Sequence, residues 1–209
     1  IDNAAILKSS AAKGGIPRLI RMLSEHPEVH RDAAGALWAL SADRKNQHLI
    51  AEADGLSPLV ELLKNGKKNA AQETAAGALH ALAQRADNRT AIGETGAIGL
   101  LSKLFEDGSA EAKVETAGAL LTLSVDNLSN QFKITSKLVA LLAAGPDDAS
   151  EASTNLVGIA RVEACEHATR VLYTMSLERD NREALSSAGS ITQLVRQLKG
   201  GSETAQTMA

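Results

Sequence analysis

The sequence predicts an all-α fold of stacked helices that repeats about every 41 residues. The first observation is an alanine-rich helical segment whose copies follow one another at intervals of 42, 41 and 52 residues. The second is an apolar helix ahead of each copy, with hydrophobic residues three and four positions apart in a single stripe. The third is composition, since 44% hydrophobic residues with only 2% aromatic residues and four prolines suit helix-on-helix packing better than a β-sandwich.

The alanine-rich segments share the pattern A-G-A-L-x-x-L in three clear copies, Ala33–Ser41, Ala75–Ala83 and Thr116–Ser124, and recur in a degenerate fourth copy, Ala168–Ser176. The apolar helices ahead of them, and one after the last, are Leu19–Leu23, Leu59–Leu63, Leu101–Phe105, Leu138–Leu142 and Leu194–Leu198. One such unit cannot bury its own apolar faces, so successive units must stack into a continuous core.

A third, short helix is expected between each alanine-rich segment and the next apolar helix. Asn46, Asn88 and Asn181 each lie five residues beyond the end of an alanine-rich segment, and we expect the asparagine to cap the short helix. Glycines then mark the break before the next helix, at Gly14, Gly55, Gly96 and Gly189. Each repeat is therefore predicted as a short helix, an apolar helix and a long alanine-rich helix.

This combination, N-x(3)-I/L, then G-x-I-P-x-L-V-x-L-L, then A-A-G-A-L-x-x-L-A/S, resembles the armadillo repeat. The two-helix HEAT repeat is the nearest alternative, but it lacks the short helix between asparagine and glycine. The resemblance implies a right-handed α-α superhelix, an armadillo-type solenoid of about four to five repeats that we expect to be incomplete at both ends. It would be a single domain over residues 1–209, with repeats near 3–45, 46–87, 88–129, 130–180 and 181–209.

The fourth repeat departs from the pattern at two places. Asn130 lies only eight residues before Leu138 and no glycine separates them, so the short helix is expected to be truncated or merged. About fifteen extra residues lie near 145–162, between the two helices that follow. Insertions in solenoids map to loops on one face. This one is interpreted either as a tolerated surface loop or as a loop that contacts a partner.

The sequence contains no phosphate-binding glycine loop, G-x-S-x-G elbow, H-E-x-x-H pair or C-x-x-C pair. Cys165 and His167 are two positions apart and would point away from each other on a helix. We therefore expect no enzyme activity, no cofactor, no metal site and no small-molecule substrate. The net charge of -3 favours no binding to nucleic acid, and the lack of a long apolar run favours no membrane insertion. A single cysteine fits a reducing, cytoplasmic compartment.

The resemblance also implies that the long helices line a concave groove, with asparagines that clamp a peptide two residues after the central leucine. Here those positions hold Ala39, Ala81, Thr122 and Thr174, and the tryptophan-type positions hold Gly35, Gly77, Gly118 and Arg170. The clamping ladder is missing, which predicts a smooth groove of small residues with Leu79 in the core beneath Gly77 and Ala81. Trp38 and His80 occupy equivalent positions, as packing residues or as part of a binding ladder. The candidate partner-binding residues are Gly35, Trp38, Ala39, Gly77, His80, Ala81, Gly118, Thr122, Arg170 and Thr174.

These observations favour a non-catalytic scaffold for protein-protein interaction, a structural or assembly subunit that docks other proteins within a larger complex. Two alternatives stay open. One is a peptide or cargo adaptor of the importin-α or β-catenin type, and the other is an accessory armadillo domain of a larger enzyme such as a ubiquitin ligase.

Overall fold

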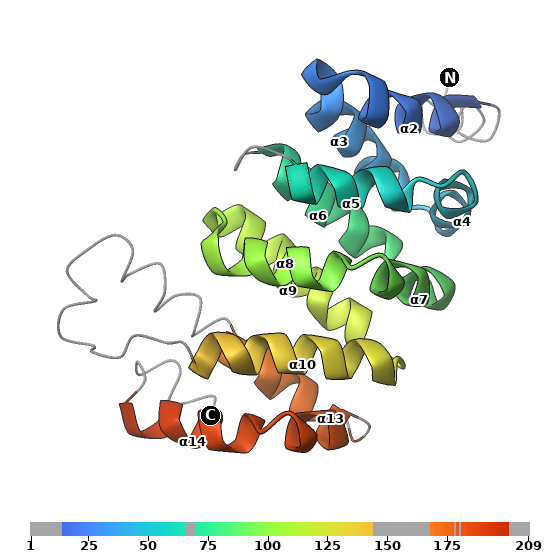
Figure 1. Ribbon diagram of the computed structural model, residues 1–209. Coiled ribbons are helices and arrows are strands. Elements are labelled where there is room, and N and C mark those ends of the chain that lie inside the picture. The colour runs from blue at the N-terminus through green and yellow to red at the C-terminus, as the bar shows by residue number, and fades with distance from the viewer. Residues whose placement is uncertain (1–13, 66–69, 144–167, 178, 180, 201–209) are drawn as a thin grey trace.

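The computed structural model describes residues 14–65, 70–143, 168–177, 179 and 181–200, and every regular element among them is helical. The predicted insertion near 145–162, Cys165, His167 and the first and last residues of the chain lie outside this part. The helices stack in order along the chain as a solenoid (Figure 1). The predicted all-α solenoid is therefore confirmed.

Two helical layers run the length of the stack (Figure 1). We call the first the apolar-helix layer; it contains α2 (Ile16–Glu25), α5 (Leu56–Asn65), α8 (Ala97–Asp107), the second half of α10 (Leu128–Ala143) and α14 (Ser190–Gly200). We call the second the long-helix layer; it contains α3 (His30–Leu40), α6 (Ala70–Leu82), α9 (Ala110–Ser124) and the helical residues 168–177. A short 3-10 turn, η2 (Pro27–Val29), joins α2 to α3.

The short helices are α4 (Arg44–Glu52), α7 (Ala86–Glu94) and α13 (Asn181–Ser187), which lie together at one end of the layers (Figure 1). In the fourth repeat the short helix and the apolar helix are one continuous helix, α10, so the merged alternative is confirmed. At the other junctions the backbone turns through a left-handed residue, Gly14, Gly96 or Gly189, and at the second repeat through Asp54 rather than Gly55.

The core lies between the two layers and continues from repeat to repeat. Leu37, Leu79, Leu120 and Leu172, one from each long helix, are fully buried, as are Leu59 and Leu101 of the apolar-helix layer. The prediction that Leu79 points into the core is confirmed. Alanines on the same helices, such as Ala34 and Ala76, are also fully buried and allow the close packing of α3 against α6 and of α6 against α9.

Asn46 and Asn88 have a different role from the predicted one, whereas Asn181 is the first residue of α13. The side chain of Asp43, not of Asn46, caps α4, by accepting a hydrogen bond from the backbone N–H of Lys45 at 2.9 Å. Asn46 lies inside α4, and Asn88 likewise lies inside α7. Both are buried, and their side-chain amides donate to the carbonyl oxygens of Leu40 and Leu82 at 3.0 Å.

The asparagine therefore gives a second hydrogen bond to a carbonyl oxygen at the end of the preceding long helix, which also accepts the backbone N–H of Asp43 or Arg85. The residue after it satisfies the next carbonyl in the same way. Gln47, Arg89, Gln131 and Arg182 donate side-chain hydrogen bonds to the carbonyl oxygens of Ser41, Ala83, Ser124 and Ser176, respectively.

Two of the asparagines also join neighbouring repeats. The Nδ2 atom of Asn88 donates to the carbonyl oxygen of Gln47 at 3.2 Å, and that of Asn130 donates to the carbonyl oxygen of Arg89 at 2.9 Å. These bonds set the spacing between successive short helices, and with it the position of each long helix in the stack.

Candidate protein-binding face

The candidate residues all belong to the long-helix layer. We use the name long-helix face for its surface. Equivalent positions recur along each long helix and the turn that follows it: Arg31, Gly35, Trp38 and Ala42 in the first repeat; Glu73, Gly77, His80 and Gln84 in the second; Val114, Gly118, Leu121 and Val125 in the third; and Arg170, Tyr173 and Leu177 among the described residues of the fourth. Residues spaced three and four apart share one side of a helix, so each set forms a stripe along its helix.

The first part of this face is filled by a ring packed over a glycine. A Cβ atom at Gly77 would lie 2.6 Å from Cε2 of Trp38, so the indole of one repeat occupies the space above the glycine of the next. Gly77 is consequently buried. The prediction that Gly77 faces an open, smooth groove is therefore wrong, because the indole covers it. Gly35, at the equivalent position of the previous repeat, has only an ordinary contact with Thr74.

His80 repeats the arrangement one step along the stack. A Cβ atom at Gly118 would lie 2.5 Å from Cε1 of His80, and the smaller imidazole leaves Gly118 partly exposed. The ring is held in place by Glu115, whose Oε2 lies 3.3 Å from Nδ1 of His80. Trp38 and His80 thus both act as packing residues between long helices, one of the two interpretations left open by the sequence.

The second part of the face has no ring on a glycine. Arg170 takes the place of the glycine and is exposed, while Leu121 takes the place of the ring and is partly exposed. On the same two stripes four large apolar side chains are exposed: Val114, Val125, Tyr173 and Leu177. We call this set, with Leu121 and Arg170, the apolar patch. Its exposed apolar members were not among the predicted binding residues, although they lie on the stripes of Gly118 and Arg170.

The positions at which clamping asparagines were expected are open to different degrees. Ala39 and Thr174 are exposed, whereas Ala81 and Thr122 are partly buried. The Thr174 hydroxyl donates to the carbonyl oxygen of Arg170, four residues earlier in its own helix, at 2.9 Å. None of these four residues has the side-chain amide that would donate to and accept from an extended peptide backbone.

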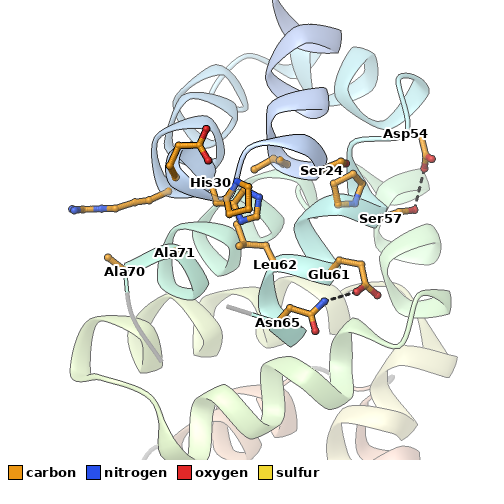
Figure 2. A pocket seen from close by; sticks show the side chains of 14 residues that line it. Ser24, His30, Asp54, Ser57, Glu61, Leu62, Asn65, Ala70 and Ala71 are labelled. Carbon is orange, nitrogen blue, oxygen red and sulfur yellow. Dashed lines mark hydrogen bonds between the residues drawn. The ribbon is translucent and has the colours of Figure 1, made fainter. Parts of the chain in front are cut away.

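A cavity of about 1120 Å³ lies elsewhere, between the first two described repeats, and was not predicted (Figure 2). Its polar groups are mostly satisfied by one another: Ser57 donates to Asp54 at 3.0 Å and Asn65 donates to Glu61 at 2.8 Å (Figure 2). The Nε2 atom of His30 is buried without a partner. Residues 66–69, which connect two lining residues, lie outside the described part, so the long-helix face remains the better candidate.

Within the described residues, no three His, Cys, Asp or Glu side chains come together as a possible metal site. The helices of that same part include none that is both long and apolar enough to cross a membrane.

Comparison with known proteins identifies the repeat and the fold. The armadillo/β-catenin-like repeat model matches residues 12–42. No curated protein sequence matches the chain. Among solved structures, a designed armadillo repeat protein in complex with the peptide (KR)4 is 24% identical, with a TM-score of 0.69, over 97% of this chain and 82% of that chain.

Two further structures show the same fold. Computationally designed armadillo repeat proteins for modular peptide recognition are 24% identical, with a TM-score of 0.68, over 97% of this chain and 82% of that chain. A chain from a study of the interaction between cadherin and β-catenin is 20% identical, with a TM-score of 0.58, over 92% of this chain and 35% of that chain. The repeat model thus matches the chain over residues 12–42, and the solved structures show that the chain has the fold of an armadillo-repeat solenoid.

Proposed function

We propose that this chain is a non-catalytic scaffold that holds another protein against the apolar patch of its long-helix face. The observation that carries the proposal is the exposure of Val114, Val125, Tyr173 and Leu177 along two neighbouring long helices. In the first two repeats the positions of the valines and the leucine hold Arg31, Ala42, Glu73 and Gln84. The position of Tyr173 holds Trp38 and His80, whose rings pack over glycines instead. A group of exposed large apolar side chains beside a polar surface is typical of a protein-binding site.

The chemistry of the patch favours a protein partner over the other classes. Valine, leucine and tyrosine side chains bind apolar protein surface, and Arg170 would pair with a carboxylate at the edge of the contact. A net charge of -3 gives no general attraction to nucleic acid. Among the residues that the structure describes, no three His, Cys, Asp or Glu side chains come together as a possible metal site. The structural neighbours include a designed protein in complex with a peptide and designed proteins for modular peptide recognition, which supports binding of a protein segment here. We place this activity in the cytoplasm, in keeping with the single cysteine.

The test uses a photo-crosslinking amino acid at Tyr173 in the full chain, with the same amino acid at exposed Lys103 of the apolar-helix layer as a control. A protein crosslinked only from Tyr173 would be identified and its affinity measured for the Val114→Asp/Leu177→Asp double variant. Both positions are exposed, so the variant should fold, and its affinity should fall by about tenfold or more. Equal crosslinking from both positions, or unchanged affinity in the double variant, would reject the apolar patch as the docking surface.

An adaptor for extended peptides is the second candidate, supported by the fold and by the neighbour bound to the peptide (KR)4. It would require side-chain amides along the face, where this chain has Ala39, Ala81, Thr122 and Thr174. The armadillo solenoid could also be an accessory part of a larger enzyme. Binding measurements on the apolar patch apply equally in that case, because the partner would still be a protein.

A further inference from the structure

The position of the long helices that holds Trp38 and His80 holds a third ring, Tyr173, in the fourth repeat. The ring of Trp38 lies over Gly77 of the long helix that follows. The ring of His80 lies over Gly118 one repeat later. Tyr173 belongs to the last long helix that the structure describes, at the end of the stack coloured orange and red (Figure 1), and it is 45% exposed. Among the described residues, the contact of a ring with the next long helix is therefore open at this end.

The apolar helix at the same end, α14, is open in a corresponding way. Ile191 and Val195 are 62% and 42% exposed. The equivalents of Ile191 in the four earlier apolar helices are all buried: Ile16, Leu56, Ile98 and Thr135. Inside the stack, each long helix packs against the preceding long helix and against the apolar helix of its own repeat, as α9 packs against α6 and α8. The fourth long helix and α14 therefore form one further corner of this kind, and we call Tyr173, Ile191 and Val195 the end corner.

The filled corners show what kind of helix fits. A Cβ atom at Gly77 would lie 2.6 Å from Cε2 of Trp38, which is too close, so a helix that lies under such a ring needs a glycine at that point. Beside this glycine, α6 buries Ala76 and Leu79 completely. A helix seated on the end corner therefore needs a glycine under the ring of Tyr173, with alanine and leucine next to it.

We propose that the protein held by the apolar patch docks a glycine-containing α-helix into the end corner, with the glycine under the ring of Tyr173. This docking mode rests on the proposed function, because Tyr173 is a member of the apolar patch. Apolar side chains of the same partner helix pack against Ile191 and Val195 and bury them. The contact continues the packing of long helix on long helix that holds the solenoid together. Since a helix fills each corner inside the stack, a helix fits the end corner better than an extended peptide does.

The probe is a fluorescein-labelled peptide with the sequence of residues 109–124, which is α9 with its capping serine. In this chain that sequence receives a ring over Gly118, and its length is near the minimum for a helix in water. The matched peptide carries Gly118→Leu. Leucine favours a helix more than glycine does, so weaker binding of the matched peptide cannot come from a loss of helix.

Binding is measured by fluorescence anisotropy, with the full chain and with variants of it. Tyr173→Ala removes the ring, and Ile191→Ser/Val195→Ser removes the apolar side chains of α14 from the end corner. The matched control is Leu128→Ser/Phe132→Ser, which replaces another exposed apolar pair on a different helix, α10. Thermal melting verifies that each variant is folded, as expected for substitutions of exposed residues.

The unchanged peptide should bind the full chain, and the Gly118→Leu peptide should bind about tenfold more weakly or worse, because its leucine meets the ring. In Tyr173→Ala the difference between the two peptides should disappear, since the ring that excludes the leucine is gone. Ile191→Ser/Val195→Ser should weaken binding of the unchanged peptide several-fold, and the α10 control should leave it unchanged.

The docked helix is overturned if the two peptides bind the full chain equally well, if their difference persists in Tyr173→Ala, or if neither binds at millimolar concentration. The proposed function would survive such a result if the crosslinked partner still requires Val114 and Leu177, so the two proposals can fail separately. Peptide binding that appears only after residues 201–209 are removed would assign the end corner to those residues of the same chain instead.

Discussion

In the first half of the long-helix face the chain fills its own surface, whereas in the second half it leaves apolar side chains exposed. The indole of Trp38 lies over Gly77 and the imidazole of His80 lies over Gly118. One repeat later, Arg170 replaces the glycine and Leu121 replaces the ring. A stack of similar repeats can therefore use the same position for internal packing in one place and for an open surface in another. The predictions below test this difference.

The largest expected effect comes from the core beneath the face, in the first half. Leu79 is fully buried, so Leu79→Ala should lower the free energy of unfolding by about 2–5 kcal/mol through lost burial and a residual cavity. Thermal and urea unfolding of the variant measure this loss of stability. A loss below about 1 kcal/mol would mean that the stack closes around the smaller side chain.

A smaller effect is expected where the ring covers the glycine. In Gly77→Ala the new methyl group must displace the Trp38 indole, which should cost about 1–3 kcal/mol and outweigh the helix-forming gain of alanine. Gly35→Ala is the matched control, because its Cβ would only touch Thr74 at 3.5 Å. That variant should gain about 0.5–1 kcal/mol. If both variants shift the unfolding free energy alike, the indole is not tightly seated on Gly77.

A gain in stability is expected at the merged helix. Thr135 is fully buried in α10 at a position that holds Ile16, Leu56 or Ile98 in other repeats, and its hydroxyl has no hydrogen-bond partner. Replacing it with the isosteric valine removes the unsatisfied hydroxyl, so Thr135→Val should raise the free energy of unfolding by about 1 kcal/mol. Calorimetric melting checks this, with Thr122→Val on the partly exposed face as the comparison. A destabilised Thr135→Val protein would show that the hydroxyl is satisfied in solution.

The smallest effect on stability is expected from charge at the edge of the face. Ala81 is only partly buried, so Ala81→Arg should change the unfolding free energy by no more than about 0.5 kcal/mol. Comparing this variant with Leu79→Ala tests whether the two residues lie on different sides of α6, one on the surface and one in the core. Unfolding of the Ala81→Arg protein at ordinary temperature would place Ala81 in the interior.

No measurable binding is expected for a lysine-rich nuclear-signal peptide. The positions that would need side-chain amides hold Ala39, Ala81, Thr122 and Thr174, and Trp38 packs on Gly77 instead of forming an open indole pocket. Isothermal titration calorimetry tests this. A micromolar or tighter dissociation constant would show that this face clamps peptides without an asparagine ladder.

Much of the fold was predictable because helical periodicity is local. The spacing of Leu37, Leu79 and Leu120 indicated the buried side of each long helix. The missing glycine before Leu138 indicated a truncated or merged short helix, and the structure has the merged one. The role of the asparagines was not predictable in the same way. The residues around Asn46 do not show which group its side chain will bond. Its amide donates to the carbonyl oxygen of Leu40 only because α4 folds back against the end of α3.

The ten candidate residues lie on the long helices in the register that the sequence indicated, and their role in binding a partner stays a prediction. The sequence did not indicate that Gly77 would be covered while Arg170 would be open, because a ring reaches a glycine in the next repeat and not in its own. Val114 and Tyr173 look like ordinary helix residues in the sequence. Their exposure depends on which neighbouring helix packs beside them.

By itself, therefore, the sequence determined the repeat length, the three helices of each repeat and the leucines that form the core, since these depend on contacts a few residues apart. The tertiary structure decided which positions of the long-helix face are covered by a side chain from the neighbouring repeat and which are exposed. The bonds of Asn88 and Asn130 to the preceding repeat span 41 residues, and the contact of Trp38 with Gly77 links two different long helices. Such contacts depend on how the repeats are stacked, and that stacking also decides which apolar side chains of the long helices are exposed.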